Sequence, residues 1–301
     1  MKVLVLGSLG FIGSNLIDYL KGYNCMIYGC DLTDTSVKDY TYQKVSILSA
    51  DFEIFFQKEC FDICINASGS GSVTYSINHP ISDFESNTFT VAKVLDTIRK
   101  HTLTCKYLHI SSAAVYGDPI SLPISESSEL NPLSPYGYHK LMSEQICQEY
   151  YAIFNVPICI VRPFSVYGNG LKKQLLWDIC EKFRKSKEVL LFGTGNESRD
   201  FIHIEDLCRL ILKIIAECDF TGGVYNAASG VETSIADVVY ICKANLHVSK
   251  NITFTGNAKE GDPKNWRADI SKIKALGFNT TITIAKGIPE YVRWYHTQWN
   301  N

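Results

Sequence analysis

Short apolar runs alternate with amphipathic stretches through the first half of the chain. Residues 1–6 form an apolar run that leads into a glycine-rich turn, and apolar residues then recur at helical spacing as far as Leu20. A second apolar run, residues 25–30, stops at Asp31. Because continuous apolar runs are typical of parallel strands that are buried on both faces, this order predicts a strand, turn, helix and strand.

The same rhythm continues to about residue 165. Further strands are predicted at residues 63–66, 107–110 and 157–161, and helices at 81–100 and 136–154. After Arg162-Pro163 the rhythm loosens, with a helix over 172–185 and several glycine turns. We therefore predict an α/β fold: a Rossmann-type, doubly wound parallel sheet in residues 1–165 and a smaller mixed α/β substrate-binding domain in residues 166–301. Some later segments are expected to return to the first domain.

The glycine turn carries the first candidate chemistry. Gly7, Gly10 and Gly13 follow the first strand and open the first helix, as in a dinucleotide site, where the pyrophosphate lies at a helix N-terminus. Asp31 ends the second strand and can accept hydrogen bonds from a ribose 2′-OH. Because Asp31 would repel a 2′-phosphate and no Arg lies near it in the sequence, NAD is favoured over NADP. The alternative is an ordinary turn, which the strand–helix–strand context argues against.

Composition narrows the class of protein further. The formal charge of the 301 residues is −2, which favours neither a nucleic-acid nor a membrane partner. The first apolar run is too short for a signal peptide, and no apolar stretch reaches the length of a membrane span. The 11 cysteines form no CxxC pair and no zinc spacing. We therefore expect a cytoplasmic protein with reduced thiols and no metal.

A second candidate site combines a strand end with a helix. Ser111 and Ser112 follow the strand at residues 107–110, where ligands collect in open α/β sheets. Tyr136 and Lys140 are four residues apart and share one face of the predicted helix. A neighbouring ammonium and an oxidised nicotinamide would both favour the phenolate and lower the pKa of Tyr136. Taken alone, the Tyr and Lys could equally be an exposed pair.

Other conspicuous residues have simpler interpretations. We expect His139 at the surface, and His203 in a structural role within a strand. Trp294 and Trp299 are interpreted as packing residues of a C-terminal amphipathic helix. The basic residues between 182 and 187 are interpreted as a solvated helix end.

Several further motifs follow in order along the chain: Ser112-Ala113-Ala114-Val115-Tyr116-Gly117, Arg162-Pro163-Phe164-Ser165, Arg199-Asp200-Phe201 and Glu260-Gly261-Asp262-Pro263. With the glycine turn and the Tyr136/Lys140 pair, they resemble the extended short-chain dehydrogenases/reductases that act on nucleoside-diphosphate sugars. That family includes UDP-galactose 4-epimerase and 4-keto-6-deoxy sugar reductases. The resemblance covers nearly the whole chain.

The resemblance assigns roles to individual residues. It implies that Ser112, Tyr136 and Lys140 are catalytic. The implied cofactor contacts are Gly7, Gly10, Phe11, Ile12, Gly13, Asp31, Leu32, Ala67, Ser86, Tyr136, Lys140 and Phe164. The implied substrate contacts are Ser112, Tyr136, Ser165, Arg199 and Lys259.

This sequence also departs from the family pattern at several positions. Ser46 stands where relatives often have Asp near the adenine, Ser165 replaces a common Asn, and Lys259 replaces Arg. Lys keeps the charge of Arg but loses its bidentate fork for phosphate. Ala113-Ala114 replaces the Asp-Glu pair of the 4,6-dehydratases, so water elimination is not expected.

The expected function is therefore an NAD-dependent epimerase of a nucleoside-diphosphate sugar, which acts at C4 through a transient 4-keto intermediate. One alternative is an NAD(P)H-dependent reductase of a nucleotide-linked 4-keto-6-deoxy sugar on the same residues. Another is a catalytically silent NAD-binding protein, which would be free to lose Ser112, Tyr136 or Lys140 although all are present. The helices at 81–100 and 136–154 resemble those with which relatives form a homodimer.

Overall fold

The computed structural model describes the whole chain except residues 38, 47–51, 258–260 and 300–301. Its internal contacts divide the chain into two compact units. The first unit comprises residues 1–117, 130–162 and 211–225, and the second comprises residues 118–129, 163–210 and 226–301. Each unit is therefore assembled from segments that are distant in sequence.

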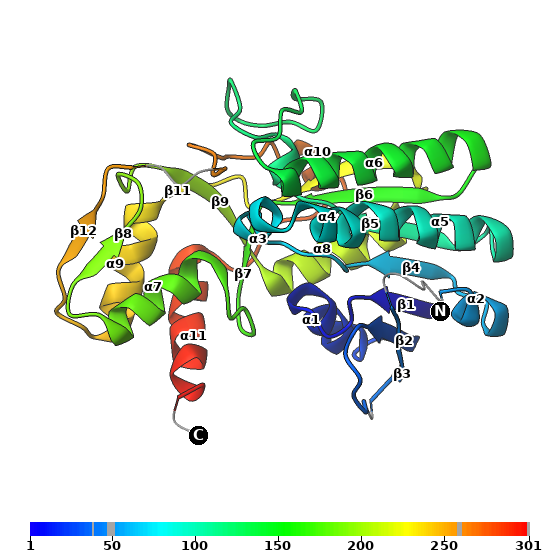
Figure 1. The fold of residues 1–301 in the computed structure, drawn as a ribbon, viewed down its shortest axis with the longest axis horizontal. Helices are drawn as coiled ribbons and strands as arrows, with labels where there is room; N and C mark the ends of the chain where they lie inside the picture. Colours follow the sequence, from blue (N-terminus) through cyan, green and yellow to red (C-terminus); the bar gives the residue numbers. More distant parts are fainter. Residues whose placement is uncertain (38, 47–51, 258–260, 300–301) are drawn as a thin grey trace. The chain divides into compact units, whose positions relative to one another are not determined.

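A seven-stranded sheet forms the centre of the first unit (Figure 1). Its order is β10-β6-β5-β4-β1-β2-β3, and the neighbours from β6 to β3 pair in parallel. The strands are β1 (Lys2–Leu6), β2 (Met26–Asp31), β3 (Thr41–Lys44), β4 (Ile63–Asn66), β5 (Lys106–Ile110), β6 (Ile158–Pro163) and β10 (Thr221–Ala227). The predicted Rossmann-type sheet is confirmed, and β3 is a strand that the apolar pattern did not indicate.

Helices pack against this sheet and explain why its central strands are apolar. They are α1 (Phe11–Leu20), α2 (Glu53–Lys58), α3 (Val73–Asn78), α4 (Pro80–Phe84), α5 (Thr90–His101) and α6 (Pro135–Phe154). Helices α2, α5 and α6 contact one another in that order, and their core includes Leu4 and Leu6 of β1. Val3 and Val5 are also buried, and strand alternation directs them to the opposite face.

The helix predicted over residues 81–100 is not one regular helix. A π-helical turn, Glu85–Phe89, separates α4 from α5. Such turns are rare and occur often at functional sites.

The second unit contains two small sheets. One has the order β11-β9-β7, formed by β7 (Ser165–Tyr167), β9 (Ser198–His203) and β11 (Glu232–Ser234), and β8 (Val189–Leu191) pairs with β12 (Ile252–Phe254) in the other. Its helices are α7 (Gln174–Lys185), α9 (Ile235–Leu246), α10 (Ser271–Ala275) and α11 (Ile284–Thr297), and α8 (Ile204–Glu217) contains residues of both units.

Aromatic packing joins α7 to the C-terminal segment. The Trp177 ring lies 6.2 Å from the Trp294 ring and 6.1 Å from the Trp299 ring, so the packing role expected for these tryptophans is confirmed.

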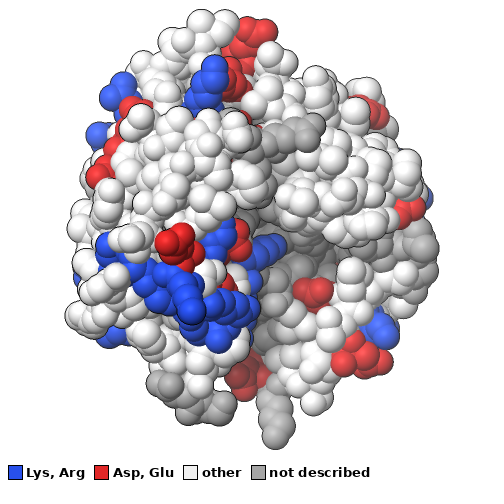
Figure 2. All heavy atoms as spheres, turned by 60° about the vertical axis from the view of Figure 1, so that its left-hand side comes forward, with Lys and Arg blue, Asp and Glu red and all other residues white. Residues whose placement is uncertain are grey.

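Surface charges of both signs are interspersed on the face drawn in Figure 2, where basic side chains gather in one patch with acidic ones among them. At the end of α7, Arg184 and Lys185 both form ion pairs with Glu181.

Within the described ranges, no helix is both long enough and apolar enough to cross a membrane.

Candidate active site

A cavity of about 880 Å³ opens at the carboxyl ends of the central strands of the first unit. Its lining includes five of the residues expected to contact the cofactor: Gly7, Asp31, Leu32, Ala67 and Ser86. The other expected contacts from the first unit, Gly10, Phe11, Ile12, Gly13, Tyr136 and Lys140, do not line this cavity. The structure therefore brings the ends of β1, β2 and β4 and the π-helical turn together around one cavity.

The glycine turn brings α1 close to β1. A Cβ atom on Gly13 would lie 2.1 Å from the carbonyl oxygen of Gly7, so a side chain there would displace the helix. Gly10, the N-cap of α1, supplies no capping side chain, which leaves the N–H groups of the first turn without a side-chain acceptor. An anion such as a pyrophosphate fits this helix end.

Asp31 completes the binding groups of the cavity. Its Oδ2 accepts a hydrogen bond from the Leu9 N–H (2.9 Å) and its Oδ1 accepts one from the Leu32 N–H (2.7 Å). These bonds fix the carboxylate beside the glycine turn and leave it able to accept ribose hydroxyls. The cavity, the uncapped helix end and the carboxylate together fit a dinucleotide such as NAD.

Ser112, Tyr136 and Lys140 come together where β5 ends and where α6 begins. Ser112 follows β5, where its Oγ accepts a hydrogen bond from the Ala114 N–H (3.1 Å), and its hydroxyl lies close enough to Tyr136 to act on the pKa of that phenol. Lys140 is buried, and its Nζ donates to the Ile110 carbonyl oxygen (2.9 Å) at the end of β5. The strand end and the helix thus meet through all three predicted catalytic residues.

The start of α6 explains how Tyr136 reaches Ser112. Ser134 caps the helix by accepting a hydrogen bond from the Gly137 N–H (3.2 Å). A Cβ atom on Gly137 would lie 2.7 Å from the carbonyl oxygen of Ala114. Glycine at this position therefore allows the first turn of α6 to approach the loop that carries Ser112.

Burial dominates the electrostatics of this group. Burial raises the pKa of Tyr136 to about 12, the neighbouring Ser112 hydroxyl acts to lower it, and the charge of Asp83 acts to raise it. Burial likewise lowers the pKa of Lys140 to about 8, against the opposing charges of Asp83 and Glu144. In the protein alone, the pKa of Tyr136 is therefore raised rather than lowered, because burial outweighs the other effects.

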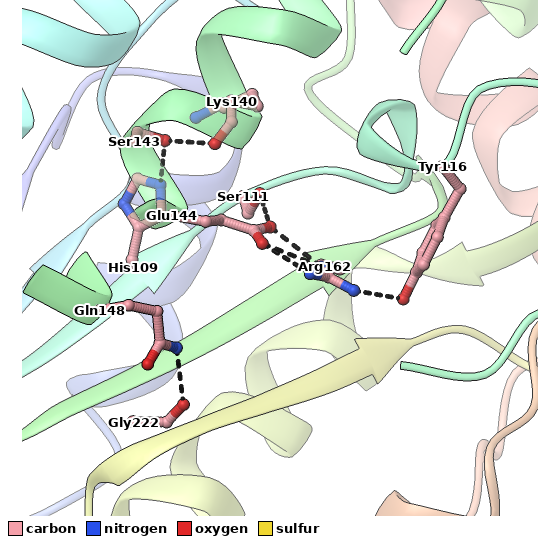
Figure 3. A network of polar contacts seen from close by, with 9 residues as sticks. All are labelled: His109, Ser111, Tyr116, Lys140, Ser143, Glu144, Gln148, Arg162 and Gly222. Carbon is pink, nitrogen blue, oxygen red and sulfur yellow. Dashed lines mark hydrogen bonds and ion pairs between the residues drawn. The ribbon is translucent and has the colours of Figure 1, made fainter. Parts of the chain in front are cut away.

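A buried polar network lies behind these residues (Figure 3). Glu144 lies one turn after Lys140 on α6, and its carboxylate accepts hydrogen bonds from Arg162 Nη2 (2.6 Å) and from the Ser111 hydroxyl (2.5 Å). Arg162, at the end of β6, also donates to the Tyr116 hydroxyl (2.8 Å). The network joins α6 to the ends of β5 and β6, directly beside Ser112.

The second unit contains the remaining predicted contacts. Arg199 lies on β9, where its Nη1 donates to the carbonyl oxygens of Ser198 (2.8 Å) and Lys264 (3.2 Å), and its Nη2 lies 3.8 Å from Asp262 Oδ2. Burial lowers the pKa of Arg199, whereas Asp262 acts to raise it.

Ser165 and Phe164 lie at the neighbouring strand of the same unit. Ser165 begins β7 and pairs in register with Phe201 of β9. Phe164 is buried with its ring edge-on to Trp266 at 5.6 Å. Lys259 lies outside the described residues.

Residues 3–228 match the model of the NAD dependent epimerase/dehydratase family. The chain belongs to this family. A protein of Bacillus subtilis named as an uncharacterized UDP-glucose epimerase, YtcB, is 30% identical to it, over 92% of both chains. A putative UDP-glucose 4-epimerase of Methanocaldococcus jannaschii is 28% identical, over 97% of both chains.

Solved structures agree with the family. A UDP-glucuronic acid 4-epimerase from Bacillus cereus, in complex with UDP-glucuronic acid and NAD, superposes with a TM-score of 0.92 and 26% identity, over 99% of this chain and 100% of the other. The family confirms the expected fold, the expected NAD cofactor and the expected class of enzyme.

Several residues that line the cavity were not predicted, among them Lys44 and Tyr75. Lys44 ends β3, pairs in register with Asp31 and lies 3.5 Å from Asp34. Tyr75 of α3 also lines the cavity. Neither position shows a pattern that family motifs would single out, because each depends on how distant segments fold around the sheet.

The structure corrects one expectation. His139 was expected at the surface, but it is buried, and its Nδ1 lies 2.6 Å from Oδ2 of Asp83 on α4. A helical wheel places His139 away from Lys140 but cannot show that α4 covers that side of α6. His203 is buried in β9, and its Nδ1 accepts a hydrogen bond from the Glu205 N–H (3.3 Å), as its predicted structural role requires.

Proposed function

We propose that this enzyme interconverts the C4 epimers of a UDP-sugar through a transient 4-keto sugar. The observation that carries the proposal is that Ser112 and Tyr136 interact where β5 ends and α6 begins, with Lys140 buried one helical turn from Tyr136 and bonded to the Ile110 carbonyl oxygen at the same strand end, in the same unit as the cofactor cavity. The epimerase names of the relatives and the UDP-sugar bound by the Bacillus cereus enzyme support the choice of substrate.

The side chains divide the chemistry among them. In the proposed reaction, the phenolate of Tyr136 takes the proton of the C4 hydroxyl, and the Ser112 hydroxyl hydrogen-bonds the C4 oxygen throughout. Lys140 supplies a positive charge that favours the phenolate, and it also holds the nicotinamide ribose. Bound NAD supplies the acceptor and then the donor of hydride at C4, so the cofactor is regenerated in each turnover.

The proposed cofactor and substrate contacts follow from the site. Gly7, Asp31, Leu32, Ala67 and Ser86 would hold NAD, with the pyrophosphate at the first turn of α1. Arg199 would bind the substrate diphosphate, because the one ion pair that its guanidinium makes among the described residues, with Asp262 at 3.8 Å, is long and leaves it able to bind a phosphate. Ser165 is assigned to the sugar, with one hydroxyl where relatives have an amide.

The direct test is to incubate the purified protein with UDP-glucose, UDP-glucuronic acid or UDP-N-acetylglucosamine without added reductant and to identify the sugars by NMR. The proposal expects the C4 epimer of at least one substrate. Tyr136→Phe is expected to lower kcat by a factor of about 10²–10⁴, since it removes the base. Tyr240→Phe, at an exposed tyrosine on α9, is the control and should retain the parent rate.

A different result would contradict the proposal. If Tyr136→Phe kept the parent turnover, Tyr136 would not be the base. If product formed only with stoichiometric loss of NAD(P)H absorbance at 340 nm, and only from a 4-keto-6-deoxy sugar, the enzyme would be the reductase instead.

We also infer a homodimer formed through α5 and α6. Tyr138 and Met142 lie four residues apart on α6 and are 48% and 40% exposed, which leaves an apolar strip on that helix. Sedimentation should give twice the chain mass, and Met142→Glu should shift the protein toward the monomer. A parent protein that sediments as a monomer at every concentration would overturn this inference.

A further inference from the structure

A buried carboxylate–imidazole pair joins α4 to the first turn of α6. Asp83 is 0% exposed, and its Oδ2 lies 2.6 Å from Nδ1 of His139. His139 comes three residues after Tyr136 and directly before Lys140. The pair therefore contacts the helical turn that carries both proposed catalytic residues.

Two further contacts hold the same turn in place. The Thr88 hydroxyl, from the π-helical turn, donates to the His139 carbonyl oxygen at 2.9 Å. The Phe84 ring lies edge-on to the His139 ring at 5.5 Å. Because Phe84 and Thr88 both follow Asp83 closely in the sequence, α4 and the π-helical turn together hold the start of α6.

The carboxylate of Asp83 is incompletely bonded. Its Oδ1 is buried and has no hydrogen-bond partner among the described residues. A buried charge is normally fully hydrogen-bonded, because removing a charge from water is costly. Its interactions with other charges are also weakly screened by the protein interior. The charge of Asp83 consequently acts on its neighbours: it adds to the effect of burial in raising the pKa of Tyr136, and it opposes the effect of burial, which lowers the pKa of Lys140.

Few other side chains act on the pKa values of Tyr136 and Lys140. For Tyr136 the other group is the Ser112 hydroxyl. For Lys140 the others are Glu144 and Cys147 on α6 itself, and the charge of Lys140 in turn lowers the pKa of His109 on β5. Asp83 is the one acidic group in both sets, so it links the behaviour of Tyr136 and Lys140.

We propose that Asp83, held by His139, is a positioning residue of the active site: it fixes the first turn of α6 and places one negative charge behind Tyr136 and Lys140. That charge adds to the effect of burial in keeping Tyr136 a phenol, and it opposes the effect of burial in keeping Lys140 an ammonium. The catalytic role of Asp83 in this inference rests on the proposed function, whereas the test below requires only the free protein.

The test follows the ionisation of Tyr136 directly in the free protein. The protein is labelled with ¹³C at the tyrosine Cζ, and the resonance absent from Tyr136→Phe identifies Tyr136. In Asp83→Asn the side chain keeps its size and can still accept a hydrogen bond from His139, but loses its charge. The titration midpoint of Tyr136 is expected to fall by about one pH unit.

Three further variants separate charge from packing. His139→Ser removes the imidazole partner but keeps the Asp83 carboxylate, so the titration midpoint of Tyr136 should rise. Thr88→Val removes the bond to the backbone without changing any charge and should leave the midpoint in place. Asp96→Asn on α5 is the matched control, because its carboxylate pairs with Arg99 and Lys100 at the surface.

An unchanged midpoint in Asp83→Asn overturns the inference, as does a fall in His139→Ser. If Asp83→Asn does not fold, the direction of the shift in His139→Ser decides the question. The titration needs neither substrate nor turnover, so its failure leaves the epimerase proposal standing. Conversely, absence of epimerase activity would leave the measured shifts intact.

Discussion

Helix α6 carries two buried acid–base pairs that differ in how fully they are bonded. Near its start His139 pairs with Asp83, and five residues later Glu144 pairs with Arg162. Both oxygens of Glu144 have partners, and Arg162 donates through Nε, Nη1 and Nη2. Asp83 has one oxygen with a partner and one without. Asp83 and Glu144 are thus both buried, but only the Glu144 carboxylate has hydrogen-bond partners for both of its oxygens.

The comparison separates two uses of a buried charge. In a fully bonded pair, the charge of each member is largely compensated by its own hydrogen bonds. Glu144 and Arg162 therefore mainly fix α6 against the ends of β5 and β6. A half-bonded carboxylate is poorly compensated, and its field reaches the neighbouring ionisable groups. We therefore expect the first pair to matter most for stability and the second mainly for the ionisation of Tyr136 and Lys140.

The largest effect is expected when the complete pair is broken. Glu144→Ala leaves the Arg162 guanidinium buried without its carboxylate, which should lower the free energy of unfolding by about 3–5 kcal/mol. Urea denaturation measures this loss. Glu59→Ala, which breaks the half-exposed pair with Lys2, is the control and should cost about 0–1 kcal/mol.

A double variant sharpens this result. Replacing both members, as in Glu144→Met with Arg162→Met, removes the unpaired charge and should restore stability to within about 2 kcal/mol of the parent. If the double variant is as unstable as Glu144→Ala, lost packing rather than an unpaired charge explains the single variant.

The next largest effect concerns pH, because Lys140 lies between the two pairs. Burial lowers its pKa from 10.5 to about 8, so between these pH values the unfolded chain binds a proton that the folded chain lacks. Stability should therefore rise with pH across this window, by about 2–3 kcal/mol from this group.

The measurement is the difference in unfolding free energy between the parent and Lys140→Met at several pH values. Taking the difference removes the contributions of the buried cysteines and tyrosines, which both proteins share. A difference that does not change between pH 8 and pH 10.5 would show that Lys140 has an ordinary pKa in the folded protein.

The smallest effect on stability is expected from the incomplete pair. Asp83→Asn removes a buried charge that is already half unsatisfied, so it should change the free energy of unfolding by about 1 kcal/mol. Thermal and urea unfolding measure it beside Glu144→Ala. A loss as large as that of Glu144→Ala would erase the distinction between the two pairs.

Local patterns in the sequence were sufficient for much of the site. The turn from Gly7 to Gly13 and the acid at Asp31 are determined by near neighbours in the sequence, and Gly7 and Asp31 line one cavity whereas Gly10 and Gly13 do not. Tyr136 and Lys140 share a helical face, and their approach to Ser112 depends on the end of the preceding strand in the sheet order. The glycine turn, the acid and the shared helical face are therefore determined by short-range sequence patterns.

The rest depends on contacts between distant segments. Asp83 and His139 are 56 residues apart, and nothing near either residue indicates that they meet. Arg162 and Glu144 lie on different elements, although Glu144 continues the helical face of Tyr136 and Lys140 and so could have been suspected. The π-helical turn at Glu85–Phe89 breaks a stretch whose apolar spacing predicts one helix.

The proposed mechanism is tested most directly with a UDP-sugar that carries deuterium at C4, incubated with the protein and no added reductant. The epimerase mechanism predicts that the C4 epimer retains the deuterium at C4, because hydride returns to the carbon that it left. Loss of the deuterium to solvent, or no epimer while NAD(P)H is consumed with a 4-keto sugar, would contradict it.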